Sequence, residues 1–301
     1  MSVQLQIAFL ISLFAAGFIA RRRGWLLPAH AGSMLKLVMT VGLPALLLAS
    51  VSRIPLHRDL LALPLAAVMV MLVTMAIAAL IGRGLGLPRA SHGAFLICSM
   101  SINTSFVFPF VLAAWGQEAF SQLALFDLGN AILQATVIYG VAALYGGHAT
   151  GAVAILKRVL SFPPLWALAA ALAINLGGIE LPTLLLNTLG GVGRVIVLLV
   201  ILAVGILFDV KLLRSGRVAG VLALRIVLGF ALALGCVQLL GLTGLTRAVV
   251  LLGSAAPIGF SAVVIANRES LDRDLAASAA SLSVLLALVY VPLALWLLHE
   301  P

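Results

Sequence analysis

The chain carries very little charge and almost no cysteine. Only 9% of its 301 residues are charged, whereas soluble proteins average about 25%. Its two cysteines, Cys98 and Cys236, lie in separate apolar segments without CxxC spacing, which argues against a disulfide framework or a zinc site. No His, Cys and carboxylate residues are spaced as metal ligands within an apolar segment. We therefore expect no metal, no cofactor and no catalytic site, so the chain is not expected to be an enzyme.

Hydrophobic residues instead make up 63% of the chain. They form runs of about 20 residues, the length that crosses a hydrocarbon core of about 30 Å. This pattern predicts an all-α polytopic membrane protein with ten transmembrane helices. The expected spans are 3–20, 34–52, 60–81, 91–114, 119–144, 156–176, 188–208, 217–239, 244–266 and 275–298. The first is expected to be retained, because Arg21, Arg22 and Arg23 follow its apolar run instead of preceding it.

The basic residues predict the orientation. With an external N-terminus, thirteen Lys and Arg residues fall in cytoplasmic connections and only Arg53, Arg58 and Arg247 in external ones. Positive residues favour the cytoplasmic side, so a multi-pass protein of the cell inner membrane with both termini external is expected. Arg194 and Arg225 fall inside spans, where we expect them to snorkel to the interface. The net charge of +9 is explained by topology and anionic lipid, not by a nucleic acid partner.

Two of these spans are interrupted by polar, Gly and Pro residues. The fourth contains 101–109 and the ninth contains 253–261. Interrupted segments at corresponding places in two halves point to a transporter's binding site, because freed backbone groups in a bilayer survive only beside protein or a cavity. Five spans per half is an odd number, so the halves 1–147 and 155–301 are expected to be inverted repeats with broken crossover helices four and nine.

The first interruption is the more polar. Asn103, Thr104 and Ser105 precede Pro109, which together with Pro257 is expected to mark the crossover. The half-helix that follows the interruption would direct its positive dipole end at an anion. The alternative is a kinked but continuous helix repaired by Ser and Thr.

The second interruption, around Pro257, Ile258 and Gly259, offers mainly backbone groups. Close packing of small residues is the alternative explanation there.

Polar residues also share one face of the fifth span. Asp127, Asn130 and Gln134 are spaced i, i+3 and i+7, and a carboxylate at mid-membrane costs roughly 2.5–3.5 kcal/mol. They are expected to line a substrate or ion pathway, with Asp127 and Asn130 as candidates for proton or ion coupling. The alternative is an interhelical hydrogen-bond network.

At these residues the chain resembles the auxin efflux carrier family, which includes the plant PIN carriers and short bacterial relatives. The similarity spans nearly the whole chain. The matching motifs are Asn103-Thr104 with Phe108-Pro109 and Trp115-Gly116, Leu133-Gln134 with Tyr139, Ala256-Pro257-Ile258-Gly259 with Tyr290 and Pro292, and Gly42-Leu43-Pro44. The long central loop of the plant carriers is missing here, and Ile258 stands where those carriers tend to be polar.

The resemblance implies a fold like that of the PIN carriers and bile-acid symporters, commonly as a homodimer. Spans 1, 2, 6 and 7 would form a scaffold, and spans 3–5 and 8–10 a transport domain that moves against it as an elevator. It also implies that the substrate carboxylate lies near Asn103 at the crossover. Gln134, Tyr139 and Ser50 would help to line the pocket.

The sequence therefore predicts a secondary transporter in the lipid bilayer that exports a small organic anion by alternating access. The membrane potential alone supplies about 2.3 kcal/mol per charge per 100 mV. One alternative is a sodium- or proton-coupled symporter or antiporter of the related fold. A channel, or a sensor that binds ligand without moving it, is the other.

Overall fold

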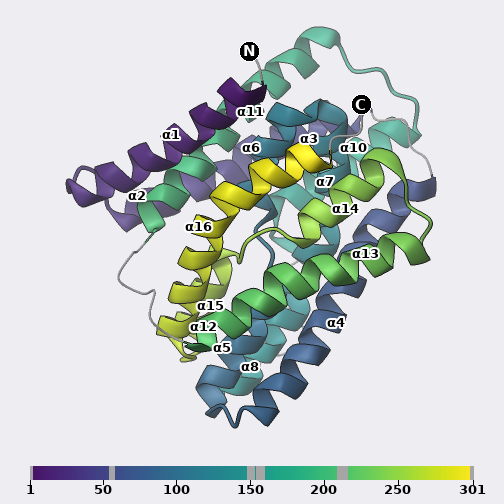
Figure 1. Ribbon diagram of the computed structural model, residues 1–301. Coiled ribbons are helices and arrows are strands. Elements are labelled where there is room, and N and C mark those ends of the chain that lie inside the picture. Colours follow the sequence, from purple (N-terminus) through teal and green to yellow (C-terminus); the bar gives the residue numbers. More distant parts are fainter. Residues whose placement is uncertain (1–2, 54–57, 148–152, 154–159, 209–215, 299–301) are drawn as a thin grey trace. The chain divides into compact units, whose positions relative to one another are not determined.

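The computed structural model describes residues 3–53, 58–147, 153, 160–208 and 216–298, and these residues form helices joined by short turns and extended segments (Figure 1). The longer helices are α1 (Val3–Arg22), α2 (Pro28–Leu37), α3 (Leu43–Val51), α4 (Ala62–Gly84), α5 (Arg89–Met100), α6 (Thr104–Ala114), α7 (Gly116–Leu133), α8 (Tyr139–Gly146), α10 (Pro163–Leu176), α11 (Thr183–Leu207), α12 (Gly216–Leu222), α13 (Gly229–Leu239), α14 (Gly244–Ser254), α15 (Phe260–Arg268) and α16 (Arg273–Leu297). Short π-helical segments join three helix pairs: η1 (Val38–Gly42), η3 (Gln134–Ile138) and η5 (Ala223–Leu228).

Seven helical segments of the described chain are long and apolar enough to cross a membrane. They are Pro28–Val51, Ala62–Gly84, Arg89–Ala114, Gly116–Gly146, Thr183–Leu207, Arg217–Leu239 and Arg273–Leu297. A multi-pass membrane protein is thereby supported, and each segment overlaps one expected span. The count of ten stays a prediction: the other three expected spans fall on α1, on α10 with residues outside the description, and on the separate helices α14 and α15.

The chain divides into two compact units. Unit 1 contains Met1–His57, Ser105–Ala124 and Leu160–Phe208, and unit 2 contains Arg58–Thr104, Leu125–Val159 and Asp209–Pro301. Helix α7 begins in the first and ends in the second.

In unit 1, small residues let α1 and α11 pack backbone to backbone. A methyl group added at Gly17 would lie 2.2 Å from the carbonyl oxygen of Leu202, and one at Gly205 would lie 2.2 Å from that of Phe14. Arg21 donates from Nη1 to the carbonyl oxygens of Ile206 and Phe208, both at 3.0 Å. Close approach through glycine is the usual basis of helix association in membranes.

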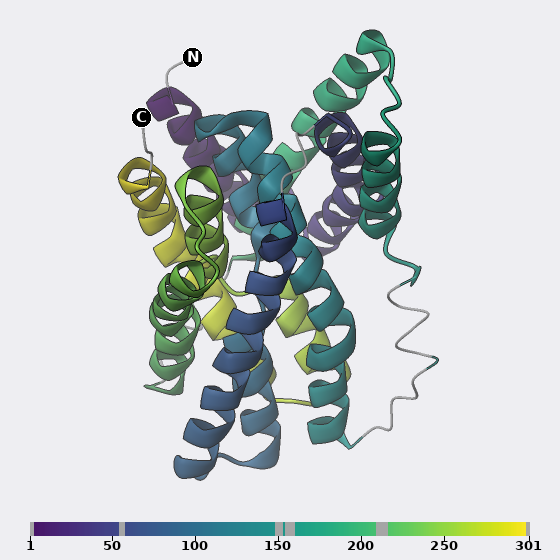
Figure 2. The same cartoon turned by 90° about the vertical axis from the view of Figure 1, so that its right-hand side faces the viewer.

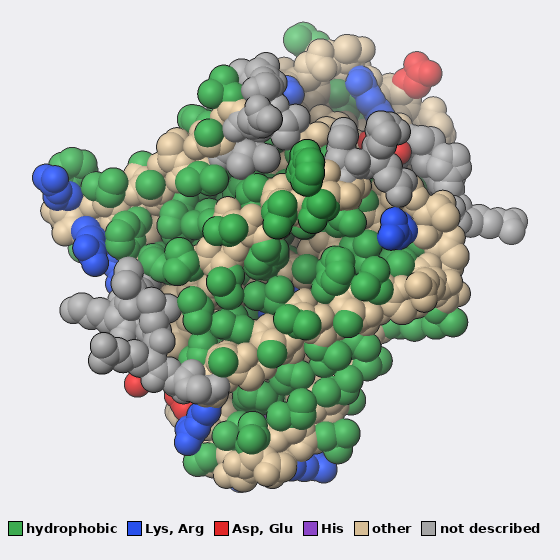
Figure 3. All heavy atoms as spheres, in the orientation of Figure 1, with side chains coloured by type: hydrophobic (Ala, Val, Ile, Leu, Met, Phe, Trp, Pro, Cys, Tyr) green, Lys and Arg blue, Asp and Glu red, His purple; other side chains and the backbone are tan. Residues whose placement is uncertain are grey.

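Unit 2 contains α4, α5, α8 and α12 to α16. Helix α14 packs beside α4 and α16, as the green, blue and yellow helices of Figure 2 show. Ser91 on α5 donates to the Asp272 carboxylate at 2.7 Å, and Asp272 also caps α16 by accepting from the Leu275 amide. Large apolar side chains of α13 and α16, including Leu239, Val289 and Trp296, are exposed, and hydrophobic atoms cover these helices in Figure 3. Lipid contact is the environment in which such a surface is stable.

Candidate functional site

The first interruption lies between α5 and α6. Helix α5 ends at Met100, Ser101 is extended (φ −67°, ψ 128°), and α6 begins at Thr104. Pro109 lies inside α6, so the expectation that it marks the crossover itself is corrected: the break precedes it. A proline in a helix removes the bond to the carbonyl four residues earlier, which here belongs to Ser105, a half-buried residue in the first turn of α6.

The second interruption, Ala255 to Gly259, separates α14 from α15, and it touches the first. The backbone N–H of Asn103 donates to the Pro257 carbonyl oxygen at 2.8 Å. Gly259 is extended (φ −67°, ψ 133°), and a methyl group there would lie 2.8 Å from Ser101 Oγ. A side chain at Gly259 would therefore require the Ser101 or Ser261 hydroxyl to move. We call the place where the two interruptions meet, and where α6 and α15 both begin, the junction.

Four successive carbonyl oxygens, from the last residue of α14 to the third residue of the second interruption, each accept a hydrogen bond. Arg225 donates to Ser254 through Nη2 and to Ala256 through Nε, the latter at 3.1 Å. The Tyr290 hydroxyl donates to Ala255 at 2.6 Å, and the backbone N–H of Asn103 donates to Pro257. This non-helical segment is thus held by the side chains of Arg225 and Tyr290 and by one backbone N–H of the first interruption.

One backbone N–H of the second interruption also has a side-chain partner. The Ile258 N–H donates to Ser283 Oγ at 2.9 Å. Ile258 itself is completely buried.

Arg225 corrects an expectation. Its side chain is 0% exposed, so it does not snorkel to the interface. The arginine fork presents several donors in a fixed plane, which matches the carbonyl groups of Ser254, at the end of α14, and of Ala256, in the interruption that follows. The sequence signal was available: an arginine within the apolar segment Arg217–Leu239 is by default a functional candidate.

Two polar residues of the expected fifth span, Asp127 and Asn130, form hydrogen bonds with the first interruption and the start of α6. Asp127 Oδ1 accepts from Thr104 Oγ1 and from Asn130 Nδ2, the latter at 2.7 Å. Asn130 Nδ2 also approaches the Ile102 carbonyl oxygen at 3.4 Å. The Asp127 carboxylate therefore holds Thr104, the first residue of α6. Through Asn130 it also holds Ile102 in the extended segment before that helix.

Gln134 and Tyr139 lie further along the same helical segment. Gln134 begins η3 and is half-buried. Tyr139 starts α8, and its hydroxyl accepts from Arg268 Nη1 at 3.2 Å. At a rise of about 1.5 Å per residue, Tyr139 is about 18 Å from Asp127 along the axis, so it is not at the junction.

Several buried polar atoms around the junction have no hydrogen-bond partner among the described residues. They are Ser101 Oγ, Ser254 Oγ, Asn130 Oδ1 and Arg225 Nη1. Buried polar atoms are rarely left unpaired, so these groups are suited to hold water or a bound ligand. They include both donors and acceptors.

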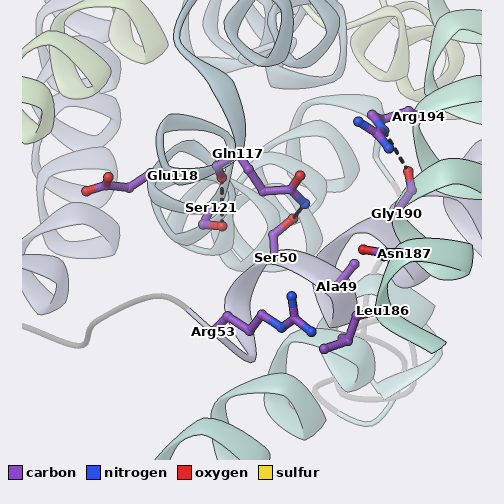
Figure 4. A pocket seen from close by; sticks show the side chains of 10 residues that line it. All are labelled: Ala49, Ser50, Arg53, Gln117, Glu118, Ser121, Leu186, Asn187, Gly190 and Arg194. Carbon is purple, nitrogen blue, oxygen red and sulfur yellow. Dashed lines mark hydrogen bonds between the residues drawn. The ribbon is translucent and has the colours of Figure 1, made fainter. Parts of the chain in front are cut away.

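Ser50 belongs to unit 1, where it lines a pocket of about 300 Å³ with Arg53, Gln117, Asn187 and Arg194. Ser50 donates to the Leu46 carbonyl oxygen at 2.7 Å. It accepts from Gln117 Nε2 at 2.6 Å (Figure 4). Among the described residues, no group of three His, Cys, Asp or Glu could hold a metal ion.

Comparison with known proteins supports a transport role. An uncharacterized transporter from Methanothermobacter thermautotrophicus is 28% identical over 287 residues, 93% of each chain. An uncharacterized transporter from Methanocaldococcus jannaschii is 25% identical over 305 residues, 97% of each chain. Residues 2–148 match the family described as membrane transport protein. The recognition of this family from the sequence is therefore confirmed over residues 2–148, which match the membrane transport protein family that includes the auxin efflux carriers.

Proposed function

We propose that this protein is a secondary transporter that exports small organic anions, with the substrate carboxylate bound at the junction of the two interruptions in unit 2. The contact between Asn103 and Pro257 carries the proposal, because it brings the beginnings of α6 and α15 to one place. A helix N-terminus presents free N–H groups and a partial positive charge, and paired half-helix ends are how transporters commonly bind anionic groups.

In this proposal the first interruption supplies side chains and the second supplies backbone. Asn103, Thr104 and Ser105 would contact the carboxylate from the start of α6. Pro257, Ile258 and Gly259 would form the opposite wall. Arg225 adds a fixed positive charge beneath that wall, through its contacts with Ser254 and Ala256. Gln134 and Tyr139 would line the path that leads to the junction.

The unit division supports a scaffold and a moving transport domain. Unit 2 contains most of expected spans 3–5 and 8–10, and unit 1 contains spans 1, 2, 6 and 7. The division departs from that scheme at Ser105–Ala124, which belongs to unit 1.

We infer an elevator motion of unit 2 that carries the junction across the membrane. The proposal also includes external termini, a homodimer built on the scaffold, and inverted repeats over 1–147 and 155–301.

Arg225 favours an anion carrier over a sodium-coupled one. In transporters with broken helices, unwound carbonyl oxygens coordinate the sodium ion. Here the carbonyl oxygens of Ser254 and Ala256 accept from a guanidinium, and those of Ala255 and Pro257 from other donors. A fixed cation thus stands where a coupling cation would bind, and transport is expected to proceed without sodium.

The test is flux from proteoliposomes of labelled malonate, a small dicarboxylate chosen as the probe of this substrate class. Asn103→Ala should reduce the rate to background while the protein still folds. Asn267→Ala, an exposed position on α15, is the matched control and should transport normally. Equal flux in both variants contradicts a site at the junction.

A further inference from the structure

The pocket of unit 1 lies between the end of α3, the start of α7 and the first half of α11. Ser50 and Arg53 come from the end of α3 and the turn after it, Gln117 from the start of α7, and Asn187 and Arg194 from α11. Its volume of about 300 Å³ is at the lower end of the range for small-molecule sites. Such a volume suits a small acid better than a large ligand.

The polar groups of the pocket favour an anion. The Arg53 side chain forms no hydrogen bond or ion pair with any residue that the structure describes, and Arg194 donates only from Nε, to the Gly190 carbonyl oxygen at 3.1 Å. Arginine forks bind carboxylates in a bidentate manner. Glu118 also borders the pocket, but in Figure 4 its carboxylate points away from Ser50, Gln117 and Arg53.

The floor of the pocket is fixed by hydrogen bonds. Ser50 and Ser121 are 4% and 1% exposed. Ser50 Oγ is held between Leu46 and Gln117, and Ser121 Oγ donates to the Gln117 carbonyl oxygen at 3.0 Å. The carboxamide of Gln117 is therefore oriented before any ligand arrives, which lowers the entropy cost of binding.

The end of α3 is anchored in the same way. Asn175 Nδ2 donates to the Val51 carbonyl oxygen at 2.8 Å. Arg53 lies two residues after Val51, the anchored end of α3.

We propose that this pocket is a second anion site, a vestibule in which Arg53 and Arg194 hold a small carboxylate at the outer mouth of the protein. The inference rests on the proposed function and topology, since Arg53 lies in an expected external connection. For an exporter such a site would receive the released anion, and it would raise the local concentration of a carboxylate that enters from outside.

The experiment separates this site from the junction. Malonate is titrated calorimetrically into purified Asn103→Ala protein, in which only the vestibule should remain. Arg53→Gln together with Arg194→Gln in that background should weaken the remaining affinity at least about tenfold, because each removes a charged hydrogen-bond donor. Arg23→Gln, an exposed arginine of unit 1, should leave it unchanged.

Transport gives the second readout. In phosphatidylcholine vesicles, which contain no anionic headgroup, Arg53→Gln with Arg194→Gln should raise the external KM for malonate and leave kcat nearly unchanged. Arg53→Lys should restore part of the affinity. If the double variant binds and transports like its Arg23→Gln control, the vestibule is refuted while the junction site stands. If Asn103→Ala itself transports normally, the proposed function fails instead.

Discussion

Replacing Arg225 with Met tests how the second interruption is held. The change keeps a long side chain but removes the guanidinium that donates to Ser254 and Ala256. A hydrogen bond from a charged donor contributes about 1.5–3 kcal/mol, so two contribute about 3–6 kcal/mol. Removing the charge also removes its desolvation cost, which is several kcal/mol. The two terms oppose each other, and global stability should change by less than about 3 kcal/mol.

Arg225→Met should lower the free energy of local opening of the second interruption more than the free energy of global unfolding, because the buried carbonyl groups of Ser254 and Ala256 lose their donors. If the second interruption opens about 3 kcal/mol more easily, its amides should exchange roughly 100-fold faster. Hydrogen exchange of the Ala255 and Ala256 amides, which donate to Leu251 and Gly253, measures this directly.

In Arg225→Met, malonate flux should fall together with the protection of these amides against hydrogen exchange. Arg225→Lys should restore only part of it, because an ammonium lacks the planar fork. Arg83→Met, an exposed position on α4, is the control. Unchanged protection and full flux in Arg225→Met would refute this account of the interruption.

Three further substitutions test the neighbouring contacts. Gly259→Ala should slow flux and destabilise the protein by about 1–3 kcal/mol, because its methyl group would lie 2.8 Å from Ser101 Oγ, whereas Gly235→Ala, with nothing within 4 Å, should be neutral in thermal unfolding. Asp127→Asn should keep potential-driven flux better than Asp127→Leu, since the amide oxygen can still accept from Thr104; complete loss in Asp127→Asn would indicate proton carriage instead. Tyr139→Phe should change the malonate KM less than about threefold, and a large increase would place the tyrosine at the binding point.

The helical membrane architecture could be predicted from the sequence because its signal is long and local. Apolar runs of bilayer length, such as 60–81 and 217–239, coincide with helices to within a few residues. The interruptions were visible for a related reason: Asn103 and Gly259 stand in segments where a membrane helix needs apolar, helix-forming residues.

What the sequence could not supply was the pairing of residues far apart in the chain. Pro109 looked like the crossover because proline is the commonest helix breaker, yet the helix begins at Thr104 and accommodates the proline within it. Arg225 looked like a snorkelling residue because its carbonyl partners lie about 30 positions later, and no local pattern links them.

The central claim is tested most directly by counterflow. Proteoliposomes loaded with unlabelled malonate are placed in labelled malonate, without sodium, and the label inside is measured over time. The account predicts transient, saturable accumulation in the wild-type protein and in Asn267→Ala, and none in Asn103→Ala. Accumulation that requires sodium, or that is the same in Asn103→Ala, would contradict it.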